Sequence, residues 1–252
     1  MMRRGIYIGG HDIQEFGAKL QTDYAISGYD VTNTVNQGFN RSNVLLLRQS
    51  FAPLHISLPL DFYGDSKEET MAQLAAFSAS LTGTFELDLG DGYQYTCVLE
   101  ELGSTAWISD EICSVDVSMS GFRHTDPLHI KSTGSFSLSF INPSTWERVA
   151  CKITIRNIKL RSAGGTVYVS LLQGDSSNDF LQYKIDPSML DGETSDTLVL
   201  DGLTMHNTYK GEPIPAGKMA WTDYPYLIPG RCMIVVRNAN CKIDVDFTPT
   251  YL

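Results

Sequence analysis

Alternation of apolar and polar residues with a period of two is the feature that most constrains the fold of this chain. Successive side chains of a β-strand point to opposite faces of the sheet, so this alternation predicts strands with one buried face. The pattern recurs along the sequence in Phe85-Leu87-Leu89, Tyr93-Tyr95-Cys97, Val115-Val117-Met119, Phe136-Leu138-Phe140, Cys151-Ile153-Ile155, Val167-Val169-Leu171, Leu198-Leu200 and Cys241-Ile243-Val245-Phe247. Short strands separated by Gly, Asn, Asp and Pro predict a mainly β chain built from sandwiches or barrels.

The alternation is interrupted at two places, and each interruption predicts a local feature of the backbone. Gly90-Asp91-Gly92 lies between two alternating segments, and Asp-Gly in that position is a strong signal for a β-hairpin. After Ile155 the alternation changes phase at Asn157-Ile158, which predicts a bulge or a bend in that strand.

One segment has the periodicity of an α-helix. Ser66-Lys67-Glu68-Glu69 fits a capping box, in which the Ser66 hydroxyl and the Glu69 carboxylate accept hydrogen bonds from free amides. The apolar residues Met71, Leu74, Phe77 and Leu81 follow at intervals of three or four, and Gly83 is a candidate C-cap. We therefore expect a single helix over about 66–82, packed on a sheet; the alternative is a helix that binds a partner.

Charge divides the chain into two halves. The chain has 252 residues and a net charge of −10, enough length for one large or two modest domains. Residues 1–128 contain 7 Lys and Arg against 17 Asp and Glu, whereas residues 129–252 contain 12 of each. Pro127 cannot donate a ladder hydrogen bond and follows a strand-like segment. We expect domains at 1–128 and 129–252, although acidic loops that aid solubility also explain the imbalance.

Several classes of protein are disfavoured. No apolar run reaches the roughly 18–20 residues of a membrane-spanning helix, and no apolar segment follows Arg3-Arg4 as in a signal peptide. The acidity argues against a protein that wraps duplex nucleic acid. The five cysteines are odd in number and form no Cys-x-x-Cys pair, so we expect buried thiols.

Signatures of catalysis are scarce. There is no Gly-x-Ser-x-Gly, Walker or His-Glu-x-x-His motif, and the five histidines are scattered. Glu100 and Glu101 are adjacent, so a regular strand would point them to opposite faces. Asp244 and Asp246 fit the solvent-exposed face of a strand better than a calcium site. We expect no enzyme activity, no cofactor and no metal site; a glycan hydrolase would need two facing carboxylates that the sequence does not nominate.

Aromatic residues gather near residue 221. Trp221, Tyr224 and Tyr226, with Asp223 as a polar neighbour, are candidate glycan contacts because aromatic faces stack on sugar rings. They would make the chain a lectin-like, carbohydrate-binding adhesion module. The alternative is that these side chains pack a loop under the edge of a sandwich.

Four short motifs resemble segments of one known family. Phe122-Arg123-His124-Thr125-Asp126-Pro127-Leu128 resembles the segment that closes the N-terminal domain of the distal tail (Dit) proteins of long, non-contractile-tailed bacteriophages. The other motifs, in the order and spacing of that family, are Thr194-Ser195-Asp196-Thr197-Leu198-Val199-Leu200-Asp201, Leu227-Ile228-Pro229-Gly230 and Phe247-Thr248-Pro249-Thr250-Tyr251-Leu252. Arg231-Cys232 departs from the pattern, where a small polar residue is expected after the turn.

The resemblance implies a structural hub of the virion tail tip, assembled in the cytoplasm of the host bacterium. It implies an N-terminal β-sandwich with one α-helix that forms a hexameric ring, and a C-terminal galectin-like β-sandwich of jelly-roll type. The implied partners are five further copies of the chain, the tail tube protein, the tail-tip or baseplate hub protein, and receptor-binding proteins or host surface glycans. No membrane partner is implied, and DNA passes only as cargo through a central channel.

The acidic half of the chain acquires a role in such a ring. We predict that Glu86, Asp88 and Asp91, on the hairpin, line the channel. Acidic walls would repel passing DNA by the same electrostatics with which basic grooves bind it.

Overall fold

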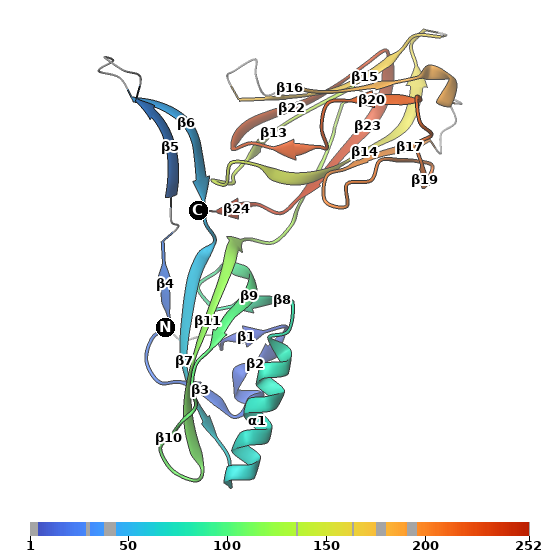
Figure 1. The fold of residues 1–252 in the computed structure, drawn as a ribbon. Coiled ribbons are helices and arrows are strands. Elements are labelled where there is room, and N and C mark those ends of the chain that lie inside the picture. The colour runs from blue at the N-terminus through green and yellow to red at the C-terminus, as the bar shows by residue number, and fades with distance from the viewer. Residues whose placement is uncertain are drawn as a thin grey trace. The chain divides into compact units, whose positions relative to one another are not determined.

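The computed structural model describes residues 5–28, 31–37, 44–134, 136–162, 164–174, 180–190 and 196–251. The chain divides into two compact units, and the division falls between Thr125 and Asp126. Figure 1 shows that both units consist mainly of strands. The predicted mainly β fold with one α-helix is confirmed over the described part of the chain. No helix among the described residues is long and apolar enough to span a membrane.

The described part of the N-terminal unit consists of strands of two to 13 residues and two helices. The strands are β1 (Tyr7–Ile8), β2 (His11–Asp12), β3 (Ala18–Leu20), β4 (Ala25–Ser27), β5 (Val31–Gln37), β6 (Val44–Phe51), β7 (Leu54–Tyr63), β8 (Thr84–Asp88), β9 (Gln94–Leu102), β10 (Ala106–Trp107) and β11 (Ile112–His124). The helices are the 3-10 helix η1 (Ile13–Phe16) and α1 (Lys67–Ser80).

One antiparallel sheet organises this unit. Its strand order is β2-β1-β8-β9-β11-β7-β3, with β4 paired to β7 and β10 to β11, while β5 and β6 form a separate ribbon. The register opposes Val115 to Leu60 and Val117 to Leu58, so the apolar residues of β7 and β11 share one face. The predicted hairpin is present: β8 pairs with β9, opposing Phe85 to Cys97.

The helix α1 covers the apolar face of this sheet (Figure 1). The Phe77 ring lies edge-on to Phe62, with centroids 5.2 Å apart. Met71, predicted to lie in the buried stripe, is 49% exposed, and the neighbouring Thr70 is fully buried. The reason is polar: the Thr70 hydroxyl lies within hydrogen-bond distance of the Ser66 carbonyl in the helix and of the Glu111 carbonyl beside it, and only an inward-facing side chain reaches Glu111.

The caps of α1 also differ in detail from the prediction. The Ser66 hydroxyl accepts from the Glu69 amide at 3.3 Å, as expected for an N-cap. The Glu69 carboxylate accepts from the Asp65 amide at 2.8 Å, one residue before the cap. The helix ends at Leu81, and Gly83 takes a left-handed φ of 73° two residues later.

The C-terminal unit consists of strands with one short 3-10 helix, η2 (Pro187–Met189). The strands are β12 (Leu128–Lys131), β13 (Ser137–Asn142), β14 (Val149–Leu160), β15 (Val167–Gln173), β16 (Phe180–Ile185), β17 (Thr197–Asp201), β18 (Thr208–Tyr209), β19 (Glu212–Pro213), β20 (Met219–Trp221), β21 (Tyr226–Leu227), β22 (Gly230–Arg237), β23 (Ala239–Phe247) and β24 (Thr250–Tyr251).

Two antiparallel sheets of this unit enclose a common core. One has the order β12-β23-β14-β17-β18-β19, and the other has the order β13-β22-β15-β16-β20. Ile153 opposes Val245 in the first sheet, and Leu171 opposes Ile234 in the second; all four are buried in one cluster. Two packed antiparallel sheets with alternating inward residues make a β-sandwich.

The change of phase predicted near residue 157 is a bulge. The register between β14 and β23 shifts between Arg156 and Lys159, and Asn157 takes a left-handed φ of 57°. Asn tolerates this conformation better than most residues with a side chain. The bulge turns Ile158 into the core, where it is 1% exposed.

All five cysteines are buried free thiols, as predicted. Burial raises the pKa of Cys97 and of Cys241 to about 12. The cysteines of this chain therefore act as small core residues.

Candidate functional site

The predicted acidic residues lie on and around the β8–β9 hairpin of the N-terminal unit. Glu86 points to the face of the sheet opposite α1, where its carboxylate accepts from the Thr96 hydroxyl at 2.8 Å. Its other oxygen lies 3.0 Å from Nε2 of His124. The His124 side chain is only 13% exposed, so this histidine is a packed member of β11.

The other two carboxylates stabilise the turn of the hairpin. Asp88 accepts from the Gly90 amide at 2.7 Å, and Asp91 accepts from the Tyr93 amide at 3.0 Å. The second oxygen of Asp91 accepts from the Tyr95 hydroxyl at 2.6 Å. Burial and this bond to a carboxylate raise the pKa of Tyr95 well above its ordinary value. Asp88 and Asp91 therefore stabilise the turn of the hairpin and also give it negative charge.

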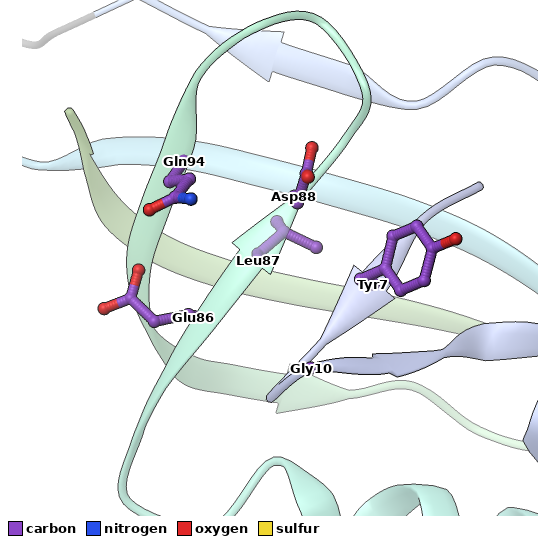
Figure 2. Close-up of a pocket in the computed structure, with 6 residues that line it drawn as sticks. All are labelled: Tyr7, Gly10, Glu86, Leu87, Asp88 and Gln94. Atoms are coloured by element: carbon purple, nitrogen blue, oxygen red, sulfur yellow. The ribbon is translucent and has the colours of Figure 1, made fainter. Parts of the chain in front are cut away.

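A shallow pocket of about 430 Å³ lies at this edge of the sheet. Figure 2 shows its lining residues, which come from β1, the β1–β2 turn, β8 and the start of β9: Tyr7, Gly10, Glu86, Leu87, Asp88 and Gln94. Tyr7 opposes Asp88 in the register of β1 and β8 and is 39% exposed. The pocket thus combines two carboxylates with an exposed aromatic ring.

The charged surface extends beyond the hairpin. The sheet face opposite α1 presents hydroxyl and carboxylate side chains in neighbouring registers: Ser57, Asp61, Glu86, Asp88, Thr96, Ser114, Asp116, Ser118 and Ser120. Asp61 accepts from the Ser114 hydroxyl and from the Gln21 side-chain amide, both at 2.5 Å. Asp61 and Asp116 were not among the residues predicted from the sequence, although each alternates with buried residues of its strand and that alternation was the available signal.

Glu100 and Glu101 are both exposed, and they do not follow the regular alternation on which the expectation of opposite faces rested. The register of β9 against β11 shifts between Ser118 and Met119, so a bulge occupies this part of β9. Glu101 opposes Ser118, and the Glu100 carboxylate lies 2.7 Å from Nδ1 of His55 on β7. A bulge places an extra residue in one strand, which removes the strict alternation.

The predicted aromatic cluster is partly assembled in the C-terminal unit. The rings of Trp221 and Tyr224 have centroids 6.3 Å apart, and Trp221 is 43% exposed. Asp223 is turned toward its own backbone, accepting from the Tyr224 amide at 2.8 Å, while its carbonyl accepts from the buried Tyr183 hydroxyl. The Tyr226 ring packs beneath the Arg148 guanidinium, 4.6 Å from the ring centroid. The exposed Trp221 ring and the half-buried Tyr224 ring thus form a pair, and Tyr226 makes its contacts elsewhere.

The remaining polar clusters have structural partners. Asp244 is held by Arg156 at 3.0 Å, and Asp246 pairs with His129. In the part of the chain that the structure describes, no three His, Cys, Asp or Glu side chains are grouped so that they could hold a metal ion.

Comparison with known proteins finds similarity in structure and not in sequence. No protein-family model matches the chain, and no curated protein sequence matches it. The fold is similar to the crystal structure of the SPP1 Dit protein (gp 19.1), described as a paradigm of the hub adsorption apparatus in phages that infect Gram-positive bacteria. That match has a TM-score of 0.69 and 11% identity, and it covers 98% of this chain and 99% of the SPP1 protein.

A second similar structure is the phage P2 baseplate in its activated conformation with Ca. Its TM-score is 0.49 at 13% identity, and the match covers 95% of this chain and 92% of that chain. The resemblance to the Dit family is therefore confirmed at the level of the fold, because this chain shares the fold of the SPP1 Dit protein over nearly its whole length.

Proposed function

We propose that this chain is a structural protein of a phage tail, the distal-tail hub that joins the tail tube to the tail-tip or baseplate proteins. The observation that supports this function best is the match to the SPP1 Dit fold at a TM-score of 0.69, over 98% of this chain and 99% of the other. In this proposal the chain forms a homo-hexameric ring through its N-terminal unit. It works by holding partners and not by catalysis, at the tip of a virion tail assembled in the host cytoplasm.

The oligomeric state tests this proposal directly. Six chains of 27.9 kDa give a ring of about 167 kDa, which light scattering on the purified protein would measure. Electron microscopy of the same sample is expected to show rings with a central hole. A species that stays at 27.9 kDa at every concentration and shows no ring would contradict the hexamer.

We assign Glu86, Asp88 and Asp91 to the channel wall, together with Asp61 and Asp116 on the same helix-free face. The support is that the charge excess lies in the first half of the chain and that these carboxylates lie on or beside a face that α1 leaves uncovered. A like-charged wall keeps DNA from adhering during passage. A ring structure with a neutral or basic lumen would eliminate this assignment.

The alternative function is carbohydrate binding by the C-terminal unit, for which we propose a galectin-like role. The contact between the exposed Trp221 ring and the half-buried Tyr224 ring is the observation that favours it. Asp223 and Tyr226 would then contribute at the edges of the site. Titration with host surface glycans tests it: Trp221→Ala should abolish binding, and Tyr7→Ala, which removes an exposed ring from the other unit, should leave it intact. If the Trp221→Ala variant and the unaltered protein bound glycans with equal affinity, this proposed glycan site would be ruled out.

A further inference from the structure

A second hollow, of about 460 Å³, lies on the β12-β23-β14 sheet of the C-terminal unit. Its lining residues are Thr133, Gly134, Asn157, Lys159, Asn240, Cys241 and Lys242, and we call it the β14–β23 pocket. None of the predicted site residues belongs to it.

The hollow exists because both neighbours of β23 leave the regular ladder at the same level. On one side β12 ends at Lys131, and the chain continues through Ser132, whose hydroxyl accepts from the Ile243 amide at 2.9 Å, into Thr133 and Gly134. On the other side β14 bulges between Arg156 and Lys159. The backbone of the bulge is fixed, because the Asn157 amide donates to the Asp196 carbonyl at 3.0 Å.

The pocket is lined by two cations that have no anionic partner in the described part of the chain. Lys159 opposes Asn240 in the register, and Lys242 opposes Arg156. Both lysines are exposed and neither is in an ion pair.

The carboxylates near the pocket are already neutralised by other cations. Asp244, two residues from Lys242, is 8% exposed in its side chain and bonded to Arg156 at 3.0 Å. Asp196, whose carbonyl holds the bulge, pairs its buried carboxylate with Lys210 at 3.2 Å. The local excess charge of the pocket is therefore positive, although residues 129–252 carry no net charge.

Neutral hydrogen-bond donors accompany the two lysines. The Asn240 side-chain oxygen accepts from Nε of Arg161 at 2.9 Å, so its amide group remains available to donate. Asn157 and Thr133, which carry a side-chain amide and a hydroxyl group, line the same hollow. The Cys241 thiol adds no negative charge, because burial raises its pKa to about 12.

We propose that the β14–β23 pocket binds an oxyanion, a phosphate or carboxylate group, carried on a hydroxylated molecule. Lys159 and Lys242 supply the charge, while Asn157, Asn240 and Thr133 bond the anion and the neighbouring hydroxyl groups. Amide and hydroxyl groups flank the cations and can form hydrogen bonds with hydroxyl groups of a ligand. A polyol that bears the anion therefore fits this lining better than an anion without hydroxyl groups does. The site does not depend on ring assembly or on the aromatic pair at Trp221.

Calorimetric titration of the full-length protein at low ionic strength tests the proposal. The probes are glycerol phosphate, glucuronate and, as a neutral reference, glycerol. We expect a dissociation constant on the order of 1 mM for at least one anionic probe and no binding of glycerol. A stronger signal from glycerol phosphate or from glucuronate identifies which oxyanion the pocket prefers.

Variants locate the binding. Lys159→Gln and Lys242→Gln should each weaken binding by about fivefold or more, and the double variant should abolish it. Lys184→Gln removes the same charge from an exposed position on β16, in the other sheet, and should leave binding unchanged. Lys242→Arg keeps the charge and should retain binding, which separates loss of charge from loss of folding.

Amide chemical shifts provide a second readout. Addition of the bound probe should move the signals of residues 133–134, 157–159 and 240–242 and leave those of the other sheet in place. Absence of binding by both anionic probes, or an equal loss of affinity in Lys184→Gln, would overturn the proposal.

Discussion

At the scale of single residues, Gly202 sets how closely two segments of the C-terminal unit approach. Its amide donates to the Cys151 carbonyl at 2.9 Å. A Cβ at this position would overlap the Pro225 carbonyl oxygen and approach the Cys151 carbonyl oxygen to 3.1 Å. Both obstacles are backbone atoms, which cannot rotate away as the end of a side chain can.

We predict that Gly202→Ala lowers the free energy of unfolding of the C-terminal unit by about 1–3 kcal/mol, the usual cost of overpacking. Denaturant unfolding followed by fluorescence measures the change. Gly134→Ala is the matched control, because a Cβ there meets only the Ser137 carbonyl at 3.6 Å, which is ordinary contact. Similar midpoints for the two variants would show that the backbone near residue 202 relaxes freely.

The buried thiols provide a second prediction at this scale. Thiolate is the reactive form, and burial raises the pKa of Cys97 and Cys241 from 9.0 to about 12 and that of Cys232 to about 11. We expect no rapid reaction of the native protein with Ellman's reagent at pH 8, and reaction of all five cysteines after unfolding. Prompt labelling of any thiol in the native protein would contradict this burial.

The same pKa shifts fix the sign of a pH effect on stability. The unfolded chain ionises its thiols near pH 9.0, whereas the folded chain keeps Cys97 and Cys241 protonated up to about 12. The unfolded state therefore loses protons first, and the contribution of these thiols to stability is complete below pH 9 and declines as the pH rises toward 12. Unfolding curves between pH 8 and pH 10 should show this decline.

At the scale of secondary-structure elements, α1 is the part of the N-terminal unit whose ends depend most on single side chains. The Ser66 hydroxyl satisfies the Glu69 amide, and Glu69 in turn holds the Asp65 amide. Two carboxylates, Glu68 and Glu69, lie in the first turn, where they interact favourably with the positive end of the helix dipole.

We predict that Ser66→Ala destabilises the N-terminal unit by about 1 kcal/mol, the typical cost of removing an N-cap. Hydrogen exchange of the amides in the first turn of α1 measures the effect locally. The control is Ser104→Ala, which changes an exposed serine in the chain between β9 and β10. Unchanged protection of residues 67–70 in Ser66→Ala would show that packing against Glu111 alone holds this end of the helix.

At the scale of the whole molecule, the two units have separate hydrophobic cores. One core contains residues from Ile6 to Met119, and the other contains residues from Leu138 to Phe247. No residue is common to both clusters, so each unit buries its own apolar surface. Units with separate cores are able to fold independently.

We therefore predict that fragments 1–125 and 126–252 each fold alone. Each fragment should show a cooperative thermal transition and a dispersed amide spectrum. The intact chain should unfold in two steps that the fragments reproduce. A fragment 126–252 that is soluble but lacks dispersed signals would show that its sandwich needs the N-terminal unit.

Local patterns of the sequence determined the elements and much of their capping. Eight strands, the turn at Gly90-Asp91-Gly92, the helix after Ser66 and the bulge at Asn157 were predicted from residues a few positions apart; the strands are β8, β9, β11, β13, β14, β15, β17 and β23. Other strands, among them β7, β16 and β22, were not predicted. Such features depend on periods of two or 3.6 and on turn conformations, which neighbouring residues decide. The burial of the cysteines followed from the same alternation.

Contacts between distant segments were decided only by the tertiary structure. Thr70 displaced Met71 from the buried face because the Glu111 carbonyl lies beside the helix, and a bulge placed Glu100 within reach of His55. Lys159 and Lys242 meet at one pocket because β14 and β23 pair across about 80 positions of the sequence. Periodicity gives the face on which a side chain lies, but register between remote strands determines its neighbours, and those neighbours form the candidate sites.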